Sequence, residues 1–488
     1  MREVEMYLNS HHMVKSAILY VGPDYQSCCL KDFINTTNLD EIIITGDITQ
    51  KQGLDILSPL IEQDSINKQR LPSKLQFISL EEIIPTEKEV DALVFENVED
   101  ISVLFQLEKF SPKYLVGEMK QQGLSSFALW EKYRNTCEEI LIVTKRIDMD
   151  AQVLSWKKNT DNNIELSVIF PMYNVAKYLD QCIESVTAWK ADYIEFLFVN
   201  DGSPDNSKEI VLEWAKKDRR IKLLDKPNGG CASARQWGLD RAKGRYVGFI
   251  DPDDYIDESM FRKLLRAAMI GSYEISYCGY NELYENTGET KKVDDLLGWP
   301  YNLGIVEPNK IWPMIAFSRV AIWRGIYKTD FLNRSKIHFY TDLRRFDDLP
   351  FKVETLANAK SIIAVNEHLY YYRLARPGQD VSADDDRLYV HFPIFNYLNE
   401  SVASTKDQRI IDYLQLCKIQ THRYAINKIR KEFLKEYVLN AKKDLMTTGN
   451  FFRTLFMAKK ELGKKARMYY FGMVTNNIML LNFLKHND

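Results

Sequence analysis

The chain has 488 residues and a mass of 57.1 kDa. Domains usually contain about 100 to 200 residues, so this length excludes one small module and predicts two or three domains. Hydrophobic residues make up 45% of the sequence and charged residues 27%, a composition that excludes a disordered chain. The 65 Lys and Arg nearly balance the 68 Asp and Glu, and the net charge of −3 excludes a general attraction to nucleic acid.

The cysteines and the apolar runs indicate the compartment. Seven cysteines are scattered along the chain without a C-x-x-C pair, which argues against a disulfide framework or a structural zinc site. Residues 1–16 lack the apolar core of a signal peptide, and no run reaches the roughly 18 apolar residues of a membrane-spanning helix. We therefore expect a cytoplasmic protein.

Short apolar runs alternate with helical patterns in the first third of the chain. They lie at residues 17–21, 41–44, 75–78, 92–95, 114–116 and 140–143. Such alternation predicts buried parallel strands in a Rossmann-like α/β sheet with helices on both faces. The turn at residues 22–27 has one glycine where a dinucleotide fingerprint has three. A scaffold or partner-binding role is therefore favoured over cofactor binding.

Changes in pattern suggest the domain boundaries. Residues 156–163 carry no apolar side chain after Trp156 and predict a linker. Strand patterns fade near residue 390, where long mixed-charge helical patterns begin. We expect an α/β domain of unknown role at residues 1–155, a second α/β domain at 164–389 and a helical, basic region at 390–488.

Polar side chains follow two predicted strands of the second domain. The first strand, at residues 166–171, leads into Met172-Tyr-Asn174 and a helix for which Asn174 is a candidate N-cap. The second, at residues 194–199, leads into Asn200-Asp-Gly-Ser203. Strand ends of open α/β sheets border the ligand crevice, so we expect Tyr173, Asn174 and Asp201 to lie there. The alternative is a turn with a helix cap at Asp201.

A third strand ends in a cluster of acids. Residues 226–230, Lys-Pro-Asn-Gly-Gly, precede a helix that contains Arg235, and a strand at residues 245–250 runs into Asp251-Pro-Asp-Asp254. Neighbouring carboxylates repel one another unless a cation lies between them. Oxygen ligands suit Mg²⁺ or Mn²⁺. The alternative is an acidic turn that caps the following helix.

Together these segments resemble the family-2 glycosyltransferases, which have a GT-A fold and act in bacterial surface-polysaccharide or teichoic-acid synthesis. The likeness spans roughly residues 165–380. It rests on Val168-Ile-Phe-Pro-Met-Tyr-Asn174, Val199-Asn-Asp-Gly-Ser203, Asn228-Gly-Gly230, Ala234-Arg235, Asp251-Pro-Asp-Asp254, Phe346-Asp-Asp-Leu-Pro-Phe351 and Leu369-Tyr-Tyr-Tyr-Arg373. The family pattern is altered at Asp347, where Glu is common, at Gln236, where Asn often follows the Arg, and at Arg324-Gly325, where an Asn-Lys pair is frequent.

The resemblance implies roles for individual residues. Asp348 would be the catalytic base with Asp347 supporting it, and Asp253 would contact Mn²⁺ or Mg²⁺. Asp201 and Arg235 would help to hold the nucleotide base, and Asp251 would lie near the ribose. The other residues implied in nucleotide-sugar binding are Pro171, Tyr173, Asn174 and Asn228.

The chemistry of sugar transfer needs the same groups. A cation stabilises the leaving diphosphate, and a carboxylate takes the proton of the acceptor hydroxyl. A neighbouring Asp347 should raise the pKa of Asp348 from an ordinary value of about 3.9. A single base implies one in-line displacement, which inverts the anomeric configuration. The chemistry therefore predicts an inverting transfer, and the family resemblance implies a hexosyltransferase that uses a nucleotide-diphosphate sugar, a UDP-sugar, and a glycan, lipid-linked or protein-linked acceptor.

Three other interpretations stay open. The Asp347-Asp348 pair could mark only a helix N-terminus, which favours anions. A nucleotidyltransferase would favour a Gly-rich, Lys/Arg-bearing loop after the first strand, and Phe170-Pro-Met-Tyr-Asn174 lacks one. A non-catalytic nucleotide-sugar-binding module could dispense with Asp348.

The aromatic residues between the acidic motifs are more typical of a core than of a sugar platform. They are Trp299, Tyr301, Trp312, Phe317 and Trp323. His338 and His368 lack metal-ligand spacing and are expected to be ordinary packed or surface residues.

The C-terminal region is strongly basic. Residues 401–488 carry 17 Lys and Arg against 7 Asp and Glu, a net charge of +10 that leaves −13 for the rest of the chain. Phe451, Phe452, Leu455 and Phe456 share a helical face just before a run of lysines. Such a helix can lie on an anionic membrane as a peripheral contact. It can equally pack on protein, including a second copy in a homo-oligomer.

Overall fold

The computed structural model describes residues 16–21, 41–46, 74–77, 90–98, 104–105, 107–120, 124–146, 149–158, 163–293, 311–374, 384–403 and 407–485. The chain divides into two units, one of residues 1–163 with Ala268–Ser272 and the other of residues 164–267 and 273–488. Within the described ranges, no helix is both long enough and apolar enough to cross a membrane.

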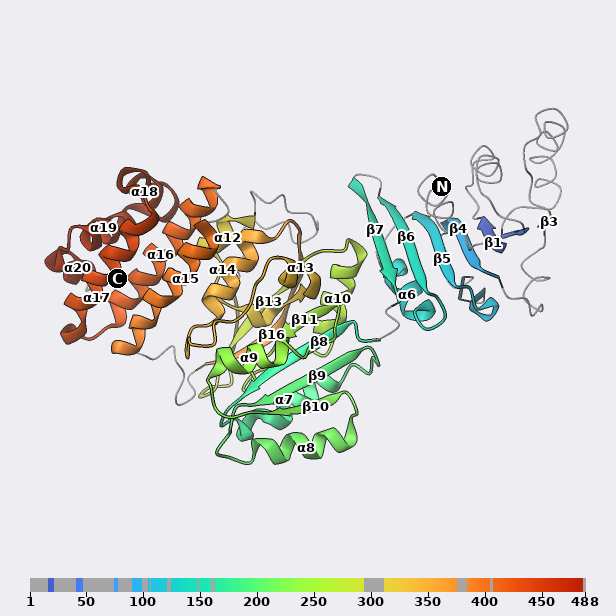
Figure 1. Cartoon of the computed structure of the whole chain (residues 1–488), viewed down its shortest axis with the longest axis horizontal. Helices are drawn as coiled ribbons and strands as arrows, with labels where there is room; N and C mark the ends of the chain where they lie inside the picture. The colour runs from blue at the N-terminus through green and yellow to red at the C-terminus, as the bar shows by residue number, and fades with distance from the viewer. Residues whose placement is uncertain are drawn as a thin grey trace. The chain divides into compact units, whose positions relative to one another are not determined.

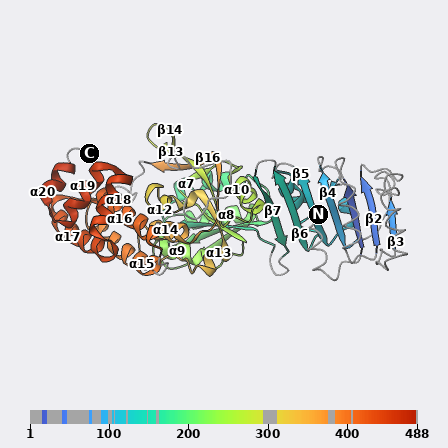
Figure 2. The same ribbon diagram turned by 90° about the horizontal axis from the view of Figure 1, so that it is seen from above.

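The first unit contains a seven-stranded sheet of order β3-β2-β1-β4-β5-β6-β7, whose strands lie side by side in Figures 1 and 2. The strands are β1 Ser16–Val21, β2 Glu41–Gly46, β3 Lys74–Phe77, β4 Ala92–Val98, β5 Tyr114–Lys120, β6 Glu139–Arg146 and β7 Met149–Lys157, with helix α6 at Leu124–Tyr133 and a 3₁₀ turn η1 at Leu107–Phe110. The first six strands are parallel, which confirms the strand prediction. The turn at residues 22–27 lies outside the described residues.

Strand β7 corrects the predicted start of the linker. Trp156 and Lys157 belong to this strand, which pairs antiparallel with β6. Trp156 is buried and meets the ring of Trp130 edge-on, with centroids 6.4 Å apart. The prediction was wrong at these two positions because an edge strand alternates buried and exposed side chains, so β7 has no continuous apolar run.

The second unit is built on a nine-stranded sheet of order β10-β9-β8-β11-β15-β13-β16-β12, with β14 paired to β13. Its strands are β8 Leu166–Met172, β9 Ile194–Asn200, β10 Ile221–Asp225, β11 Tyr246–Phe249, β12 Tyr255–Ile256, β13 Ile275–Tyr284, β14 Thr290–Val293, β15 Gly325–Lys328 and β16 Ile362–Leu374. The helices described at residues 164–374 are α7 Ala176–Thr187, α8 Ser207–Lys217, α9 Cys231–Leu239, α10 Met260–Ile270, α12 Pro313–Phe317, α13 Thr329–Arg334 and α14 Asp348–Asn358, with a 3₁₀ turn η2 at Ile322–Arg324. The last three residues of α10 belong to the first unit.

The order of the parallel strands sets the position of the site. Strands β10, β9, β8 and β11 run parallel, and Met172 of β8 pairs with Asn200 of β9. Their carboxyl ends therefore meet at one edge of the sheet. Helix α9 packs so closely on β8 that a Cβ atom at Gly238 would lie 2.5 Å from Cγ2 of Ile169.

The remaining helices form the C-terminal part of the second unit, coloured orange to red in Figure 1. They are α15 His391–Ala403, α16 Gln408–Lys428, α17 Lys431–Thr448, α18 Phe451–Met457, α19 Gly463–Val474 and α20 Ile478–Lys485, with short turns η4 Asp386–Val390 and η5 Ala458–Leu462. They enclose a core that includes the buried Tyr437, Tyr469 and Tyr470. Phe346 and Tyr413 pack against both this core and the core of the sheet. The three-domain division stays a prediction.

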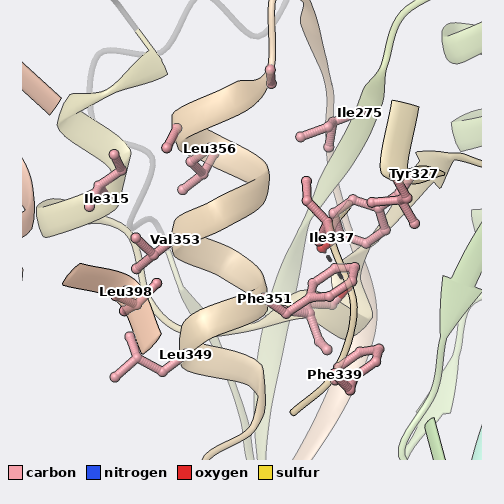
Figure 3. Close-up of a cluster of buried hydrophobic side chains, with 14 of the residues drawn as sticks. Ile275, Ile315, Tyr327, Ile337, Phe339, Leu349, Phe351, Val353, Leu356 and Leu398 are labelled. Atoms are coloured by element: carbon pink, nitrogen blue, oxygen red, sulfur yellow. Dashed lines mark hydrogen bonds between the residues drawn. The ribbon is translucent and has the colours of Figure 1, made fainter. Parts of the chain in front are cut away.

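Helix α14 is buried in the hydrophobic core on more than one side, since residues 349–357 are all buried. Leu349, Phe351, Val353 and Leu356 of this helix are buried, and Figure 3 shows them directed into a cluster that also contains Phe339 and Ile315. The rings of Phe339 and Phe351 stack with centroids 4.6 Å apart. Burying a side chain of this size contributes about 1.5–3 kcal/mol. The first residue of α14, Asp348, is therefore held on a rigid element.

Candidate active site

One cavity of about 670 Å³ collects the predicted residues at the carboxyl edge of the sheet. Nine of the ten line it: Pro171, Tyr173, Asp201, Asn228, Arg235, Asp251, Asp253, Asp347 and Asp348. Asn174 does not line it. The lining residues that sequence analysis left off the site include Arg344, Arg345, Phe346, Cys231 and Tyr372.

The end of β8 borders the cavity with an exposed aromatic ring. Tyr173 lies on the lining and is 53% exposed. Asn174 adopts a left-handed backbone conformation with φ of 56°, which Asn tolerates better than most residues. The predicted N-cap at Asn174 was wrong, because α7 starts one residue later and its first N–H groups have other partners. Val175 N–H donates to Ser207 Oγ and Ala176 N–H to Asp205 Oδ2.

Asp201 fixes the loop between β10 and α9. Its buried carboxylate accepts hydrogen bonds from the main-chain N–H of Gly229 and of Gly230, at 2.9 and 2.7 Å, and forms an ion pair with Lys226 at 2.5 Å. Gly230 has φ of 89°, a conformation that L side chains avoid. Both carboxylate oxygens of Asp201 thus bond to the loop. The contact of Asp201 with a nucleotide base stays a prediction.

Arg235 joins the two acidic motifs. This buried guanidinium pairs with Asp251 at 2.6 Å and with Asp347 at 2.8 Å. The two carboxylates are 96 residues apart in the chain, and one cation brings them together. Both terminal nitrogens of Arg235 donate to carboxylates, so its predicted contact with the base also stays a prediction.

The acids after β11 have different environments. Asp254 is buried and turned toward β16, where its carboxylate accepts hydrogen bonds from Tyr370 Oη and the main-chain N–H of Arg373, both at 2.7 Å. Burial and the charges of Asp253 and Asp251 raise the pKa of Asp254 well above its ordinary value. The carboxyl of Asp254 is thus held by hydrogen bonds to β16 and is not a candidate metal ligand. Asp251 and Asp253 line the cavity.

Carboxylate oxygens at the cavity fit a hard divalent cation only in part. Within the described ranges, no three acidic, histidine or cysteine side chains converge to hold a metal ion. Mg²⁺ is commonly bound by one or two carboxylates, with substrate phosphates and water as its other ligands. Asp253, and the carboxylate of Asp251 beside it, fit that limited donor set.

Arg373 keeps the acidic loop in place. Its Nε–H donates to the main-chain carbonyl of Asp253 at 2.8 Å, and its two terminal nitrogens donate to Glu285 and Gln181. The aromatic-Arg segment of the sequence therefore has a structural purpose at the site. Its neighbour Tyr372 faces the cavity, while Trp323 stacks under both Tyr370 and Tyr372.

Asp348 has the environment of a general base. Burial, and then the negative charge of Asp347, raise its pKa to about 7, against the opposing effect of Arg235. This confirms the predicted direction of the shift. Asp347 and Asp348 also lie at the N-terminus of α14. The pair therefore both marks a helix N-terminus and lines the cavity.

The loop before Asp347 is braced by helix α15. Tyr397 stacks on Tyr340 at 4.1 Å and donates a hydrogen bond to Asp342. Phe346 has φ of 53°, rare for a bulky residue, and its ring meets His391 at 5.3 Å. The C-terminal helices thus hold the loop that carries the acidic pair.

The aromatic and histidine residues between the motifs differ in exposure. Trp312 and Trp323 are buried, as expected of core residues, whereas Phe317 is exposed. His338 is exposed beside Tyr340. Trp299 and Tyr301 lie outside the described residues.

Comparisons with known proteins agree with this geometry. The model of the family "Glycosyl transferase family 2" matches residues 167–331. GlyG, a glycosyltransferase of Streptococcus pneumoniae serotype 4, is 30% identical over 227 residues, which cover 43% of this chain and 70% of GlyG. The uncharacterized glycosyltransferase EpsJ of Bacillus subtilis is 32% identical over 219 residues, 43% of this chain and 60% of EpsJ. The chain belongs to glycosyl transferase family 2.

A solved structure shows the same fold. The crystal structure of S. aureus TarS 1–349 superposes with a TM-score of 0.53 at 17% identity, covering 66% of this chain and 91% of TarS 1–349. The second unit therefore contains a GT-A fold. EpsJ and the next relatives are matched over only about 60% of their own length.

The Arg235 bridge yields a stability prediction. Arg235→Met leaves the buried Asp347 without its cation, and removal of one partner from a buried ion pair typically costs about 3–5 kcal/mol. We expect a loss of this size in the free energy of unfolding, measured by urea denaturation. The double variant Arg235→Met/Asp347→Asn should regain part of it, because the buried uncompensated charge of Asp347 is removed, while the more exposed Asp251 keeps its charge. Equal stability of Arg235→Met and wild type would contradict the bridge.

Proposed function

We propose that this chain is an inverting, metal-dependent glycosyltransferase. It transfers a hexosyl group from a nucleotide-diphosphate donor, a UDP-sugar, to a hydroxyl of a cell-surface glycan, teichoic acid or glycoprotein acceptor. The observation that carries the proposal is a carboxylate, Asp348, with a pKa of about 7 in the cavity that also contains Asp253.

The choice of donor and acceptor is supported by related proteins. The crystal structure of S. aureus TarS in complex with UDP-GlcNAc shares the fold, with a TM-score of 0.53. A poly(ribitol-phosphate) beta-glucosyltransferase of Bacillus spizizenii is 26% identical over 227 residues. A UDP-sugar and a sugar-alcohol phosphate polymer are therefore the first substrates to test.

In the proposed reaction, Asp348 takes the proton of the acceptor hydroxyl as its oxygen attacks the anomeric carbon. The bond from this carbon to the diphosphate oxygen breaks, and the nucleoside diphosphate leaves. One displacement inverts the anomeric centre. Arg235 holds Asp251 and Asp347 in place, and Tyr173 borders the nucleotide side of the cavity. A divalent cation held by Asp253 would neutralise charge on the leaving diphosphate.

Asp348→Asn tests the base. This change preserves size but removes the proton acceptor, so we expect kcat to fall by about 10² to 10⁴ while donor affinity holds. Steady-state kinetics and calorimetry with a UDP-sugar measure the two quantities. Failure of the wild-type protein to transfer sugar from any nucleotide sugar would favour a binding module or a nucleotidyltransferase.

Asp347→Asn is the matched control. Its charge raises the pKa of Asp348, so its removal lowers that pKa and shifts the acid limb of the pH-rate profile, where the base becomes protonated, to lower pH. An inactive Asp347→Asn beside an active Asp348→Asn would assign the base to Asp347. Two active variants would refute the single-base mechanism.

Asp253→Ala tests the metal contact. We expect it to abolish transfer and remove the Mn²⁺-dependent part of UDP-sugar binding, since a carboxylate ligand is lost. Thermal shift with UDP, with and without Mn²⁺, measures the binding. Asp254→Asn is the control, because Asp254 bonds to β16 and its loss should lower stability instead. Full activity of Asp253→Ala, or unchanged activity in chelator, would exclude this role.

The C-terminal helices expose several apolar and basic side chains, for which we propose a peripheral contact with an anionic membrane. Phe452, Phe456, Met479 and Phe483 are 78%, 66%, 82% and 62% exposed. Lys459, Lys460 and Lys464 are exposed in the same stretch. Exposed aromatic rings beside lysines favour an interface with anionic lipid. Such a contact would bring the site to a lipid-linked acceptor from the cytoplasmic face.

Phe452→Ser/Phe456→Ser tests this surface in the full chain. Truncation after Gly449 would also delete the buried Tyr469 and Tyr470, so point variants are the cleaner test. Two exposed rings would each insert apolar area into the interface, and we expect their loss to weaken liposome binding by more than about tenfold. Met446→Ser, exposed on α17, is the control. Binding to phosphatidylglycerol vesicles is measured by co-sedimentation.

Equal vesicle binding by wild type and the Phe452→Ser/Phe456→Ser variant would refute the membrane contact. A dimer that dissociates only in this variant, detected by light scattering, would assign the surface to a second copy of the chain.

A further inference from the structure

One arginine on the cavity lining, Arg344, has no carboxylate partner among the described residues. Among the charged side chains on its lining, Asp201 pairs with Lys226, and Arg235 pairs with Asp251 and Asp347. Arg344 also lines the cavity and is exposed to solvent. Among the residues that the structure describes, no carboxylate pairs with it. The side chain of Arg344 is therefore available to bind an anionic ligand.

The stem of Arg344 lies over the start of helix α9. A Cβ atom at Gly230 would stand 3.5 Å from Cα and 3.6 Å from Cγ of Arg344. Gly230 is the N-cap of the nine-residue α9 and supplies no side-chain cap. The N-terminus of a helix adds partial positive charge. The stem of Arg344 therefore lies beside a helix N-terminus in a cavity lined by several carboxylates.

The loop that carries Arg344 is held before and after it. On one side, Tyr397 stacks on Tyr340 and bonds to Asp342. On the other, Phe346 packs against His391. A side chain on an anchored loop loses less entropy when it binds a ligand, which increases its affinity. The bracing thus presents Arg344 at the cavity rather than leaving it on a free surface.

We propose that Arg344 binds a phosphate group of a substrate in this cavity, an inference that rests on the proposed function. The planar guanidinium fork matches phosphate oxygens in a bidentate way, which an ammonium does not. Arg235 is less suited to this role, because it is buried and its charge is already shared between two carboxylates. The phosphate belongs either to the diphosphate of the donor or to a phosphate of the acceptor.

Arg344→Gln tests the assignment, with two ligand pairs that separate the sources. Calorimetry with UDP and with uridine reports on the donor diphosphate. Ribitol 5-phosphate and ribitol, added to protein saturated with UDP, report on an acceptor phosphate. We expect Arg344→Gln to weaken binding of UDP or of ribitol 5-phosphate by about 10- to 100-fold, the range for hydrogen bonds to a charged group. Binding of uridine and ribitol should not change.

Two further variants complete the test. Arg344→Lys keeps the charge but loses the fork, so its affinity should be intermediate. Arg241→Gln removes an exposed cation that stacks on Trp237 at 3.6 Å, away from the cavity lining, and should bind every ligand as wild type does. Unchanged affinity of Arg344→Gln for both phosphate ligands would overturn the assignment. Wild-type protein that binds neither UDP nor ribitol 5-phosphate would refute the proposed substrates and the assignment together.

Discussion

The ion pairs of Arg235 with Asp251 and Asp347 connect the two halves of the site. Asp251 follows a strand in the first half of the GT-A fold, and Asp347 directly precedes helix α14 almost a hundred residues later. A buried ion pair of this kind is weak evidence for stability, because desolvation offsets the attraction. Its value here is geometric, since one planar cation holds Asp251 close to Asp347, the neighbour of the proposed base Asp348.

The same cation affects the charge of Asp348, the proposed base. Burial and Asp347 favour the neutral form of Asp348, whereas Arg235 favours the charged form, and the balance gives a pKa of about 7. A base is most effective when its pKa lies near the working pH. Removing Asp347 would lower the pKa of Asp348, and removing Arg235 would raise it. The pKa of Asp348 therefore depends on Arg235 as well as on Asp347.

The C-terminal helices belong to this arrangement as well. Phe346 packs against both hydrophobic cores of the second unit, directly before the acidic pair. Behind it, His391 and His422 both bond to the hydroxyl of the buried Tyr437, and His422 bonds in turn to Asp444. Burial lowers the pKa of His391 to about 3, so this ring is neutral. A rigid polar network thus supports the strained backbone at Phe346.

Much of this could be predicted from sequence, and the limits have a physical cause. Apolar runs identified the parallel strands because buried strands are apolar on both faces. Polar residues after those strands identified most of the cavity, since parallel strands end at one edge. The contacts of Arg235 with Asp347 and of Asp254 with β16 join residues more than one hundred positions apart, which no local pattern encodes. Arg344 and Arg345 were missed because two arginines in a polar loop have the pattern of a solvated surface.

The proposed mechanism depends most directly on the charge of Asp348. Infrared difference spectra between wild type and Asp348→Asn, recorded from pH 4 to pH 9 with ¹³C-labelled aspartate, isolate the titration of this one carboxyl. A carboxyl signal that converts to carboxylate near pH 7 is the predicted result. Conversion near the ordinary aspartate value of about 3.9 would show that burial and Asp347 do not tune this group, and would contradict its assignment as the base.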